Sequence, residues 1–213
     1  MSRHYAGIAF TDQVQQVQER YGSQGFYGAK AASALADRSG PDALGPHERA
    51  YLAERDTFFL ASVGETGWPY VQHRGGPMGF LRVLDDHTLG WADFKGNLQY
   101  VSVGNLAHDD RVSLIVLDHA GQQRLKIFGR ARVVDAEEDP ELVERLTPPD
   151  AGAVVERGIV VAVEAFDWNC RQHITPRYSA AELEPVHAAM RERLAAAEAE
   201  IATLRRELAA RTA

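Results

Sequence analysis

The sequence predicts a mainly β protein of the α+β class, built as an antiparallel barrel that is closed or nearly closed and flanked by helices. Between residues 57 and 166 the apolar residues fall into six or seven short runs separated by turn signals, with few helical stretches among them. Short turns favour antiparallel pairing, because parallel strands need long crossover connections. Both flanks have helical periodicity. The chain therefore divides into an N-terminal helical segment (1–46), a barrel domain (47–179) and a C-terminal helix (180–213).

The composition is that of an ordinary globular protein and excludes several classes of function. The 213 residues carry a formal net charge of -7, so no global field gathers nucleic acid. No apolar run approaches the roughly 20 residues that span a membrane, and the N-terminus lacks the apolar core of a signal peptide. The single cysteine, Cys170, excludes an internal disulfide and is expected to be buried and inert. The eight histidines have no metal-binding spacing. We expect a cytoplasmic protein without a metal.

Helices are predicted before the barrel. Residues 11–36 have apolar side chains at helical spacing, including Val14 and Val17, and an alanine-rich continuation. A break at Ser39-Gly40-Pro41 follows, and Gly45-Pro46 begins a second helix that extends to about Arg55.

The barrel strands are predicted from apolar runs bounded by turn residues. Gly64–Gly67 and Ala120-Gly121 lie at the turns of two hairpins, and an acidic helix is expected near residues 139–146. The predicted strands are 57–63, 68–74, 78–84, 88–92, 111–118, 124–134 and 158–166.

The C-terminal tail has a heptad pattern. Apolar positions alternate spacings of four and three over about four heptads, which predicts a helix that packs on the barrel or on a second copy of the chain. His187 is expected to be a tolerated polar position on this seam. The seam positions are Leu183, His187, Met190, Leu194, Ala197, Ile201, Leu204 and Leu208.

The segment WADFKGNLQYVSVGNL, from residue 91, suggests an anion site. A strand ends here and a helix begins, and a helix N-terminus exposes unpaired N–H groups. Asn97 is a good N-cap residue, Gly96 allows close backbone approach, and Lys95 adds a mobile charge. The alternative is an ordinary capped loop with a surface lysine.

Cations on two strands add to this hypothesis. Arg74 ends a predicted strand beside Gly75-Gly76, a stretch without side chains. In the strand 124–134, four basic residues have the same parity and therefore share one face, which is either a solvated basic face or part of a site for a phosphorylated planar ligand. They are Arg124, Lys126, Arg130 and Arg132.

The stretch FDWNCRQHITPRYS, residues 166–179, mixes amide, imidazole, thiol and guanidinium groups after an apolar strand. Such a segment is poor core material and is typical of an irregular segment that faces a ligand. His173 could bind a heterocycle edge or move a proton. The alternative is a loop held to the barrel by its own polar groups.

Residues 45–179 resemble the pyridoxamine 5'-phosphate oxidase-like flavoproteins, most closely a branch of predicted flavin-nucleotide-binding proteins. The resemblance lies in GWPYVQHRGGPMGFLRVLDDHTLGWADFKGNLQYVSVGNLAHDDRVSLIVLD, in RLKIFGRARVV and in FDWNCRQHITPRY. The most branch-specific part is Cys-x-Gln-His-Ile-x-Pro-Arg. It implies a split β-barrel that forms a homodimer and binds FMN at the subunit interface. The C-terminal tail is outside the resemblance.

The resemblance also implies positions for the flavin-binding residues. Arg82 corresponds to a cation on a family strand, and Asn97 and Gln99 fall on the family's Ser-Arg-Lys turn. This chain lacks two phosphate-binding charges there, for which Lys95 and Arg74 compensate. Arg124 falls near a ring-contacting strand position. The full set of expected cofactor-binding residues is Arg74, Arg82, Lys95, Asn97, Gln99, Arg124, Lys126, Gln172, His173 and Arg177.

Two functions follow from the resemblance. The first is an FMN-dependent oxidoreductase that acts on a small planar substrate, with Gln172 and His173 contacting the ring from the partner subunit and His173 as the catalytic residue. The family's C-terminal Arg-x-His substrate signature is missing, which disfavours pyridoxamine 5'-phosphate as the substrate. The second is a non-catalytic flavin-binding or redox-sensing module that signals through its C-terminal helix. Haem or deazaflavin in place of FMN is a third alternative.

Overall fold

The computed structural model describes residues 3–36, 40–169 and 171–212, so Cys170 lies outside the described residues. The chain forms two units. Residues 1–118 and 122–173 make up the first, which holds the N-terminal helices and the sheet, and residues 119–121 and 174–213 make up the second.

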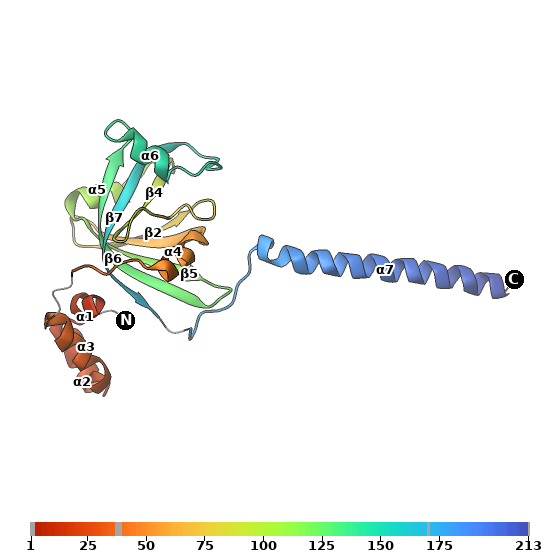
Figure 1. Ribbon diagram of the computed structural model, residues 1–213, viewed down its shortest axis with the longest axis horizontal. Helices are drawn as coiled ribbons and strands as arrows, with labels where there is room; N and C mark the ends of the chain where they lie inside the picture. Colours follow the sequence, from red (N-terminus) through yellow and green to blue (C-terminus); the bar gives the residue numbers. More distant parts are fainter. Residues whose placement is uncertain (1–2, 37–39, 170, 213) are drawn as a thin grey trace. The chain divides into compact units, whose positions relative to one another are not determined.

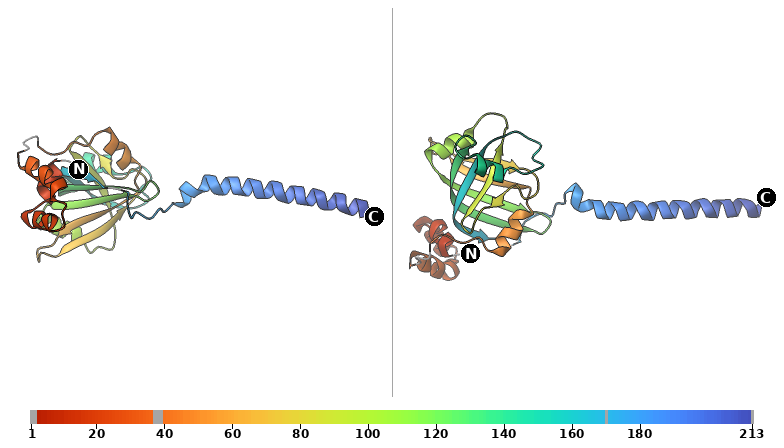
Figure 2. Two further views of the ribbon diagram at one scale, coloured as in Figure 1. Left: turned by 90° about the horizontal axis from the view of Figure 1, so that it is seen from below. Right: turned by 45° about the horizontal axis from the view of Figure 1, so that its top comes forward.

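Seven strands form one antiparallel sheet in the order β2-β1-β5-β6-β7-β4-β3. The sheet curls around its own core (Figures 1 and 2), and its two edge strands, β2 and β3, leave the barrel open between them. The split β-barrel predicted from the sequence is confirmed. The strands are β1 (Thr57–Val63), β2 (Pro69–Gly75), β3 (Arg82–Val83), β4 (Thr88–Phe94), β5 (Arg111–Asp118), β6 (Gln123–Asp135) and β7 (Val155–Trp168).

The barrel core comes from the period of two in the strands. In β1 every second residue is buried, which places Phe58 and Leu60 inside. Trp91 of β4 packs edge-on against Phe58, with ring centroids 5.0 Å apart. Strand β4 is buried on both faces because helix α6 (Pro140–Leu146) covers its outer side through Leu146. Packing on both of its faces therefore fixes the path of β4 up to the loop that follows it.

The N-terminal helices differ from the prediction of one helix over 11–36. They are α1 (Arg3–Ala9), α2 (Asp12–Arg20) and α3 (Gln24–Ala36). Gly22, with φ +77°, separates α2 from α3, because a left-handed residue ends a helix. Tyr5 of α1 stacks on Phe128 of β6 with ring centroids 5.0 Å apart.

Helix α4 (Pro46–Ala53) is anchored to the barrel by one buried hydroxyl. Tyr51 donates its O–H to the backbone oxygen of Val116 at 3.0 Å. Burial of this hydroxyl raises the pKa of Tyr51 to about 12. The anchor ties α4 to strand β5.

The predicted strand 78–84 is wrong in extent, since only Arg82–Val83 is strand. A turn precedes it, with Gly79 at φ +77°. A Cβ added at Gly76 would lie 2.7 Å from the Phe80 ring, so the chain turns too tightly here for ladder pairing.

Helix α7 (Ala180–Thr212) is the long C-terminal helix that the sequence predicts. It has no buried residue, and five of its apolar seam residues are 48–64% exposed: Met190, Leu194, Ile201, Leu204 and Leu208. Among the described residues, no helix combines the length and apolar character needed to cross a membrane.

Candidate functional site

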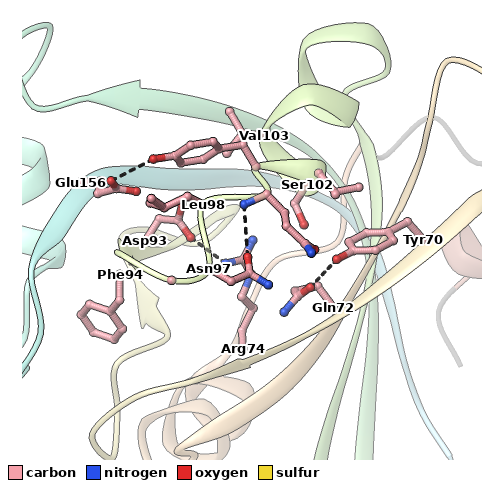
Figure 3. Close-up of a pocket in the computed structure, with 14 residues that line it drawn as sticks. Tyr70, Gln72, Arg74, Asp93, Phe94, Asn97, Leu98, Ser102, Val103 and Glu156 are labelled. Carbon is pink, nitrogen blue, oxygen red and sulfur yellow. Dashed lines mark hydrogen bonds and ion pairs between the residues drawn. The ribbon is translucent and has the colours of Figure 1, made fainter.

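A cavity of about 220 Å³ opens where the barrel is split (Figure 3). We call it the split cavity. Its walls come from β2, from the end of β4 with the loop that follows, and from the first turn of helix α5 (Val101–His108). Its lining includes Tyr70, Gln72, Arg74, Asp93, Phe94, Gly96, Asn97, Leu98, Gln99, Ser102 and Glu156.

The loop between β4 and α5 has a strained backbone. Leu98 (φ 62°) and Tyr100 (φ 51°) are two of the four non-glycine residues with positive φ in the described chain. Left-handed residues cost conformational energy, and they turn successive backbone N–H groups toward a concavity that suits an anion. The strain is concentrated on the wall of the split cavity.

The prediction that Asn97 caps the helix is wrong. Helix α5 begins at Val101, its N-cap residue is Tyr100, and no side chain caps it. The Asn97 side-chain oxygen instead accepts a hydrogen bond from the Gln99 N–H at 3.2 Å, which stabilises the turn before the helix. The first turn of α5 therefore faces the cavity without a capping side chain, as a helix N-terminus that binds an anion does.

Arg74 is paired with an acid, which the sequence did not predict. Its Nη1 donates to Asp93 Oδ1 at 2.7 Å, and this ion pair joins β2 to β4 across the split. Asp93 Oδ2 also lies 3.8 Å from Arg157 Nη1. Burial raises the pKa of Asp93, and the two guanidinium groups offset this only in part. Figure 3 shows Arg74 and Asp93 pointing toward one another.

Tyr100 ties the loop to Glu156 and Arg157 of β7. The Arg157 guanidinium lies 4.9 Å from the centroid of the Tyr100 ring, and the Tyr100 hydroxyl donates to Glu156 Oε1 at 3.2 Å. These contacts help to stabilise the left-handed backbone of Tyr100.

A second cavity of about 210 Å³ adjoins the first and shares five lining residues with it. Its other walls include Phe80, Trp91, His73 and Lys95. Trp91 is 1% exposed, and its indole Nε1 has no acceptor among the described residues. The Nε of Arg74 is likewise buried without an acceptor. A buried N–H without a partner costs free energy, so both groups favour a ligand with acceptor atoms.

The structure brings together four of the predicted site residues. Arg74, Asn97 and Gln99 line the split cavity, and Lys95 lies at the exposed rim of the adjoining one. Arg82 is not among them, because it lines a different cavity beside β3.

Arg124 and Lys126 line neither cavity at the split. Through the strand register Lys126 lies in one row with Ile115, Phe59 and His73, on the outer face of the sheet. Arg74 is paired with the core residue Phe58 and therefore lies on the inner face. Within one subunit these two cations therefore do not share a site with Arg74.

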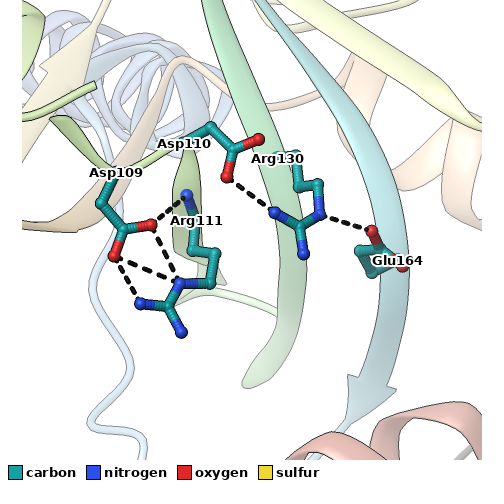
Figure 4. Close-up of polar contacts among 5 residues, drawn as sticks. All are labelled: Asp109, Asp110, Arg111, Arg130 and Glu164. Atoms are coloured by element: carbon teal, nitrogen blue, oxygen red, sulfur yellow. Dashed lines mark hydrogen bonds and ion pairs between the residues drawn. The ribbon is translucent and has the colours of Figure 1, made fainter. Parts of the chain in front are cut away.

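The basic row on β6 faces outward, as its parity predicts, but two of its members are already paired. Lys126 Nζ lies 3.5 Å from Asp167 Oδ2 and 4.7 Å from the Tyr5 ring centroid. Arg130 donates to Asp110 Oδ1 at 2.8 Å and to Glu164 Oε1 at 3.1 Å (Figure 4). These acids raise the pKa of Arg130. Arg130 and Arg132 are exposed, as a solvated basic face requires, whereas Arg124 and Lys126 are half-buried.

The late polar segment has an irregular backbone. His173 is exposed and has φ 64°, and Gln172 and Arg177 are exposed as well. His173 ends the first unit, and Arg177 belongs to the second.

Sequence reasoning missed Asp93, Trp91 and Arg157. Asp93 is an acid inside an otherwise apolar strand, WADF, and this pattern could have identified it as a buried partner for Arg74. The buried indole N–H and the ring contact of Arg157 depend on packing, and the sequence carries no signal for them.

Several solved structures are similar to this chain. HupZ from Group A Streptococcus has 14% sequence identity and a TM-score of 0.48, covering 63% of this chain and 99% of its own. A putative pyridoxamine 5'-phosphate oxidase from Lactobacillus delbrueckii has 20% identity and a TM-score of 0.45, covering 59% and 93%. An FMN-binding protein from Syntrophomonas wolfei has 15% identity and a TM-score of 0.45, covering 57% and 83%.

No curated protein matches the sequence. The family model described as pyridoxamine 5'-phosphate oxidase matches residues 44–164, which is more than half of the chain and includes both cavities at the split. The chain therefore belongs to the pyridoxamine 5'-phosphate oxidase family.

Proposed function

We propose that the chain binds FMN at the split of the barrel, with the phosphate in the split cavity and the ring in the adjoining one. The observation that carries the proposal is the pair of buried donors without acceptors, Arg74 Nε and Trp91 Nε1, in two cavities that share a wall. FMN supplies phosphate oxygens at one end and ring carbonyl oxygens at the other. Membership of the family supports a flavin as the ligand.

Each group in the site has a separate part in binding. The backbone N–H groups of the loop at Leu98 and Tyr100 and the first turn of α5 bind the phosphate, and Lys95 adds charge at the rim. Arg74 is held in position by Asp93, so its remaining donors are already oriented. The buried aromatic wall at Trp91 and Phe80 excludes water from one side of the ring.

We further propose that the protein is an FMN-dependent oxidoreductase for a small planar substrate, in a homodimer with the flavin at the subunit interface. Bound FMN supplies the redox chemistry, and the protein orients the substrate and moves protons. Gln172 binds the ring edge, and His173 donates a proton or binds the substrate, both from the partner subunit. Arg124 and Lys126, which line neither cavity, would reach the flavin only from the partner subunit, and we propose Arg177 as a further flavin-binding residue.

Two measurements test this proposal. Titration of the protein into FMN, followed by flavin fluorescence, should show saturable binding at micromolar protein. Anaerobic mixing of the complex with NADH and NADPH, followed by absorbance, should show reduction of the flavin by one of them or by another screened donor. If FMN binds but no screened donor or acceptor changes its redox state, the enzyme proposal fails and binding alone remains.

A second candidate function is supported by helix α7. We propose that α7 pairs with α7 of a second copy as a parallel coiled coil. The protein would then be a flavin-binding or redox-sensing module whose output is this interaction. The seam of α7 has no buried residue and is exposed at the apolar positions from Met190 to Leu208. In a parallel pair, Arg193 would face Glu198 of the partner subunit, and Glu200 would face Arg205 of the partner subunit, both with opposite charge. His187 would face its own copy, and a polar residue at such a position specifies register.

Exchanging the charges at positions 193 and 198 distinguishes a parallel pair of α7 helices from an antiparallel pair. In the antiparallel pair Arg193 would face Glu200 of the partner subunit instead. Arg193→Glu should weaken self-association in sedimentation experiments, and Arg193→Glu with Glu198→Arg should restore it. If the double variant associates even more weakly than the single one, the helices pair antiparallel. A chain without residues 181–213 measures association by the barrel alone, and association equal to that of the full chain would exclude pairing through α7.

A further inference from the structure

A cavity of about 530 Å³ lies between helix α1 and the outer face of the sheet, and we call it the outer cavity. His4 and Ile8 of α1 form one wall, and residues of β1, β2, β5, β6 and β7 form the rest. Its volume is in the range of cavities that bind small molecules. It shares no lining residue with the two cavities at the split, so a ligand here would not depend on the flavin site.

The wall that α1 contributes is held in place by the other side of the same helix. Tyr5 stacks on Phe128, and Ala6 is fully buried. His4 and Ile8 are four residues apart and therefore share one face of the helix. The helix thus packs on the sheet through Tyr5 and Ala6 and keeps His4 and Ile8 along the cavity. A ligand that enters a cavity already formed loses little free energy to reorganisation.

The floor of the outer cavity is mostly apolar. Ala61, Ser113 and Phe128 are neighbours in register on β1, β5 and β6. They alternate with core residues along their strands, which places them on the outer face of the sheet. Val63 and Ile8, which also line the cavity, are 36% and 42% exposed. A ligand that covered these side chains would remove apolar surface from water, which is favourable.

The arginines and the glutamate of the lining are already ion-paired (Figure 4). Arg111 Nη2 donates to Asp109 Oδ2 at 2.6 Å, and Arg111 Nε donates to Asp109 Oδ1 at 2.9 Å. Arg130 is paired with both Asp110 and Glu164. A ligand of either charge would have to compete with one of these pairs, so charge complementarity favours an uncharged ligand.

We propose that the outer cavity binds an uncharged, mostly apolar molecule with a single hydrogen-bonding group, such as a secondary aromatic amine or a phenol. The apolar body would lie against Ile8, Val63 and Phe128. His4 has no hydrogen bond or ion pair with a described residue, so its imidazole is available to the hydrogen-bonding group of the ligand.

Fluorescence titration of the full chain with N-phenyl-1-naphthylamine tests the proposal, because this dye is uncharged and fluoresces strongly when it leaves water. The matched probe is 8-anilinonaphthalene-1-sulfonate, which has the same aromatic skeleton with a sulfonate added. We expect saturable binding of the uncharged dye with a dissociation constant below about 100 µM, and binding of the sulfonate that is weaker by at least about tenfold.

Two substitutions in the cavity should weaken binding of the uncharged dye by at least about tenfold each. Ile8→Asp puts a charge on the helical wall, and Ser113→Phe fills the floor. The control is Val154→Asp, which changes an exposed apolar residue that lines none of these three cavities and should leave binding unchanged. If Ile8→Asp unfolds α1, as circular dichroism would show, Ser113→Phe carries the test.

A third substitution tests the part played by the ion pairs. Asp109→Asn leaves Arg111 without its acid, so the sulfonate should bind at least about threefold more tightly, while the affinity for the uncharged dye stays the same. An unchanged preference between the two dyes would contradict the argument from charge.

Four results would overturn the inference. The first is no saturable binding of the uncharged dye. The second is binding that Ile8→Asp and Ser113→Phe leave unchanged, which would place the dye elsewhere. The third is displacement of the dye by FMN, which would place it in the flavin site. The fourth is dye binding that falls as the protein self-associates, with association lost in Ile8→Asp, which would make the cavity a contact between two copies of the chain. Failure to bind FMN with dye binding intact would refute the proposed function alone.

Discussion

The split cavity and the cavity beside β3, which is lined by Arg49, Arg82 and Arg145, both place guanidinium groups at an open edge of the same barrel, but they differ in how the charge is compensated. In the split cavity Arg74 is paired with the buried Asp93, and the groups without partners are single N–H donors in fixed directions. In the cavity beside β3 no acid lines the wall. The first arrangement therefore selects a ligand by the geometry of its acceptors, whereas the second has no buried acid to fix the direction of its donors.

The largest effect is expected from removing Arg74, because its substitution changes both stability and binding. Arg74→Ala leaves Asp93 buried beside Arg157 alone, which should lower the free energy of unfolding by about 2–3 kcal/mol and weaken FMN binding by at least about tenfold. Urea denaturation and flavin titration measure the two quantities.

The double variant Arg74→Ala with Asp93→Asn is the matched control for this pair. It removes the unpaired carboxylate, so stability should recover in part, while FMN binding stays weak. Recovery of both quantities would mean that Arg74 only positions Asp93 and does not contact the ligand.

Removing Lys95 should separate binding from stability. Its side chain is exposed and has no ion pair with a described residue, so Lys95→Ala should weaken FMN binding by about 1 kcal/mol and leave the unfolding free energy unchanged. Arg132→Gln, a charge removed elsewhere on the surface, should change neither quantity. Equal affinities of all three proteins would remove Lys95 from the phosphate site.

A smaller effect, in the pH dependence of stability, concerns Asp93. Its pKa in the folded protein is raised above the ordinary value of 3.8, mainly by burial, so the folded state holds a proton that the unfolded state has lost. This contribution to stability is complete below the ordinary pKa and is lost as the pH rises through the raised value. Asp93→Asn cannot lose a proton, so its unfolding free energy should fall less than that of the wild type between acidic and neutral pH. Denaturant titrations at several pH values would show parallel curves if burial did not control this carboxyl group.

The smallest effect on binding is expected at His173, since it is exposed and outside both cavities at the split. His173→Ala should bind FMN with unchanged affinity but slow the turnover of any substrate that the screen identifies. A turnover equal to the wild type would refute its role in proton transfer.

The sequence predicted the barrel well because its evidence is local. The alternation of apolar residues in strands such as 57–63, together with the short turns, leaves few other topologies. The strand predicted over 78–84 failed because the turn around Gly76 and Gly79 depends on close contacts with Phe80 and Ala53 that lie outside the local pattern.

The sequence predicted cations of the candidate site, but it did not predict the groups that lie beside them. Arg74 and Lys95 are visible as charges near glycines, and the structure places both at the split. Sequence periodicity cannot show that Arg74 of β2 meets Asp93 of β4 across the split, nor that Arg82 lines a cavity with Arg49 and Arg145 instead of the split cavity. These groupings arise from the curvature of the sheet, which brings residues distant in sequence together.

The most direct test of the account is an FMN titration of the wild-type protein, followed by flavin fluorescence, with Arg74→Ala and Arg132→Gln measured beside it. The account predicts saturable binding at micromolar protein that is weakened at least about tenfold in Arg74→Ala and unchanged in Arg132→Gln. A wild-type protein that leaves flavin fluorescence unchanged at these concentrations, or an Arg74→Ala variant that binds as tightly as the wild type, would contradict it.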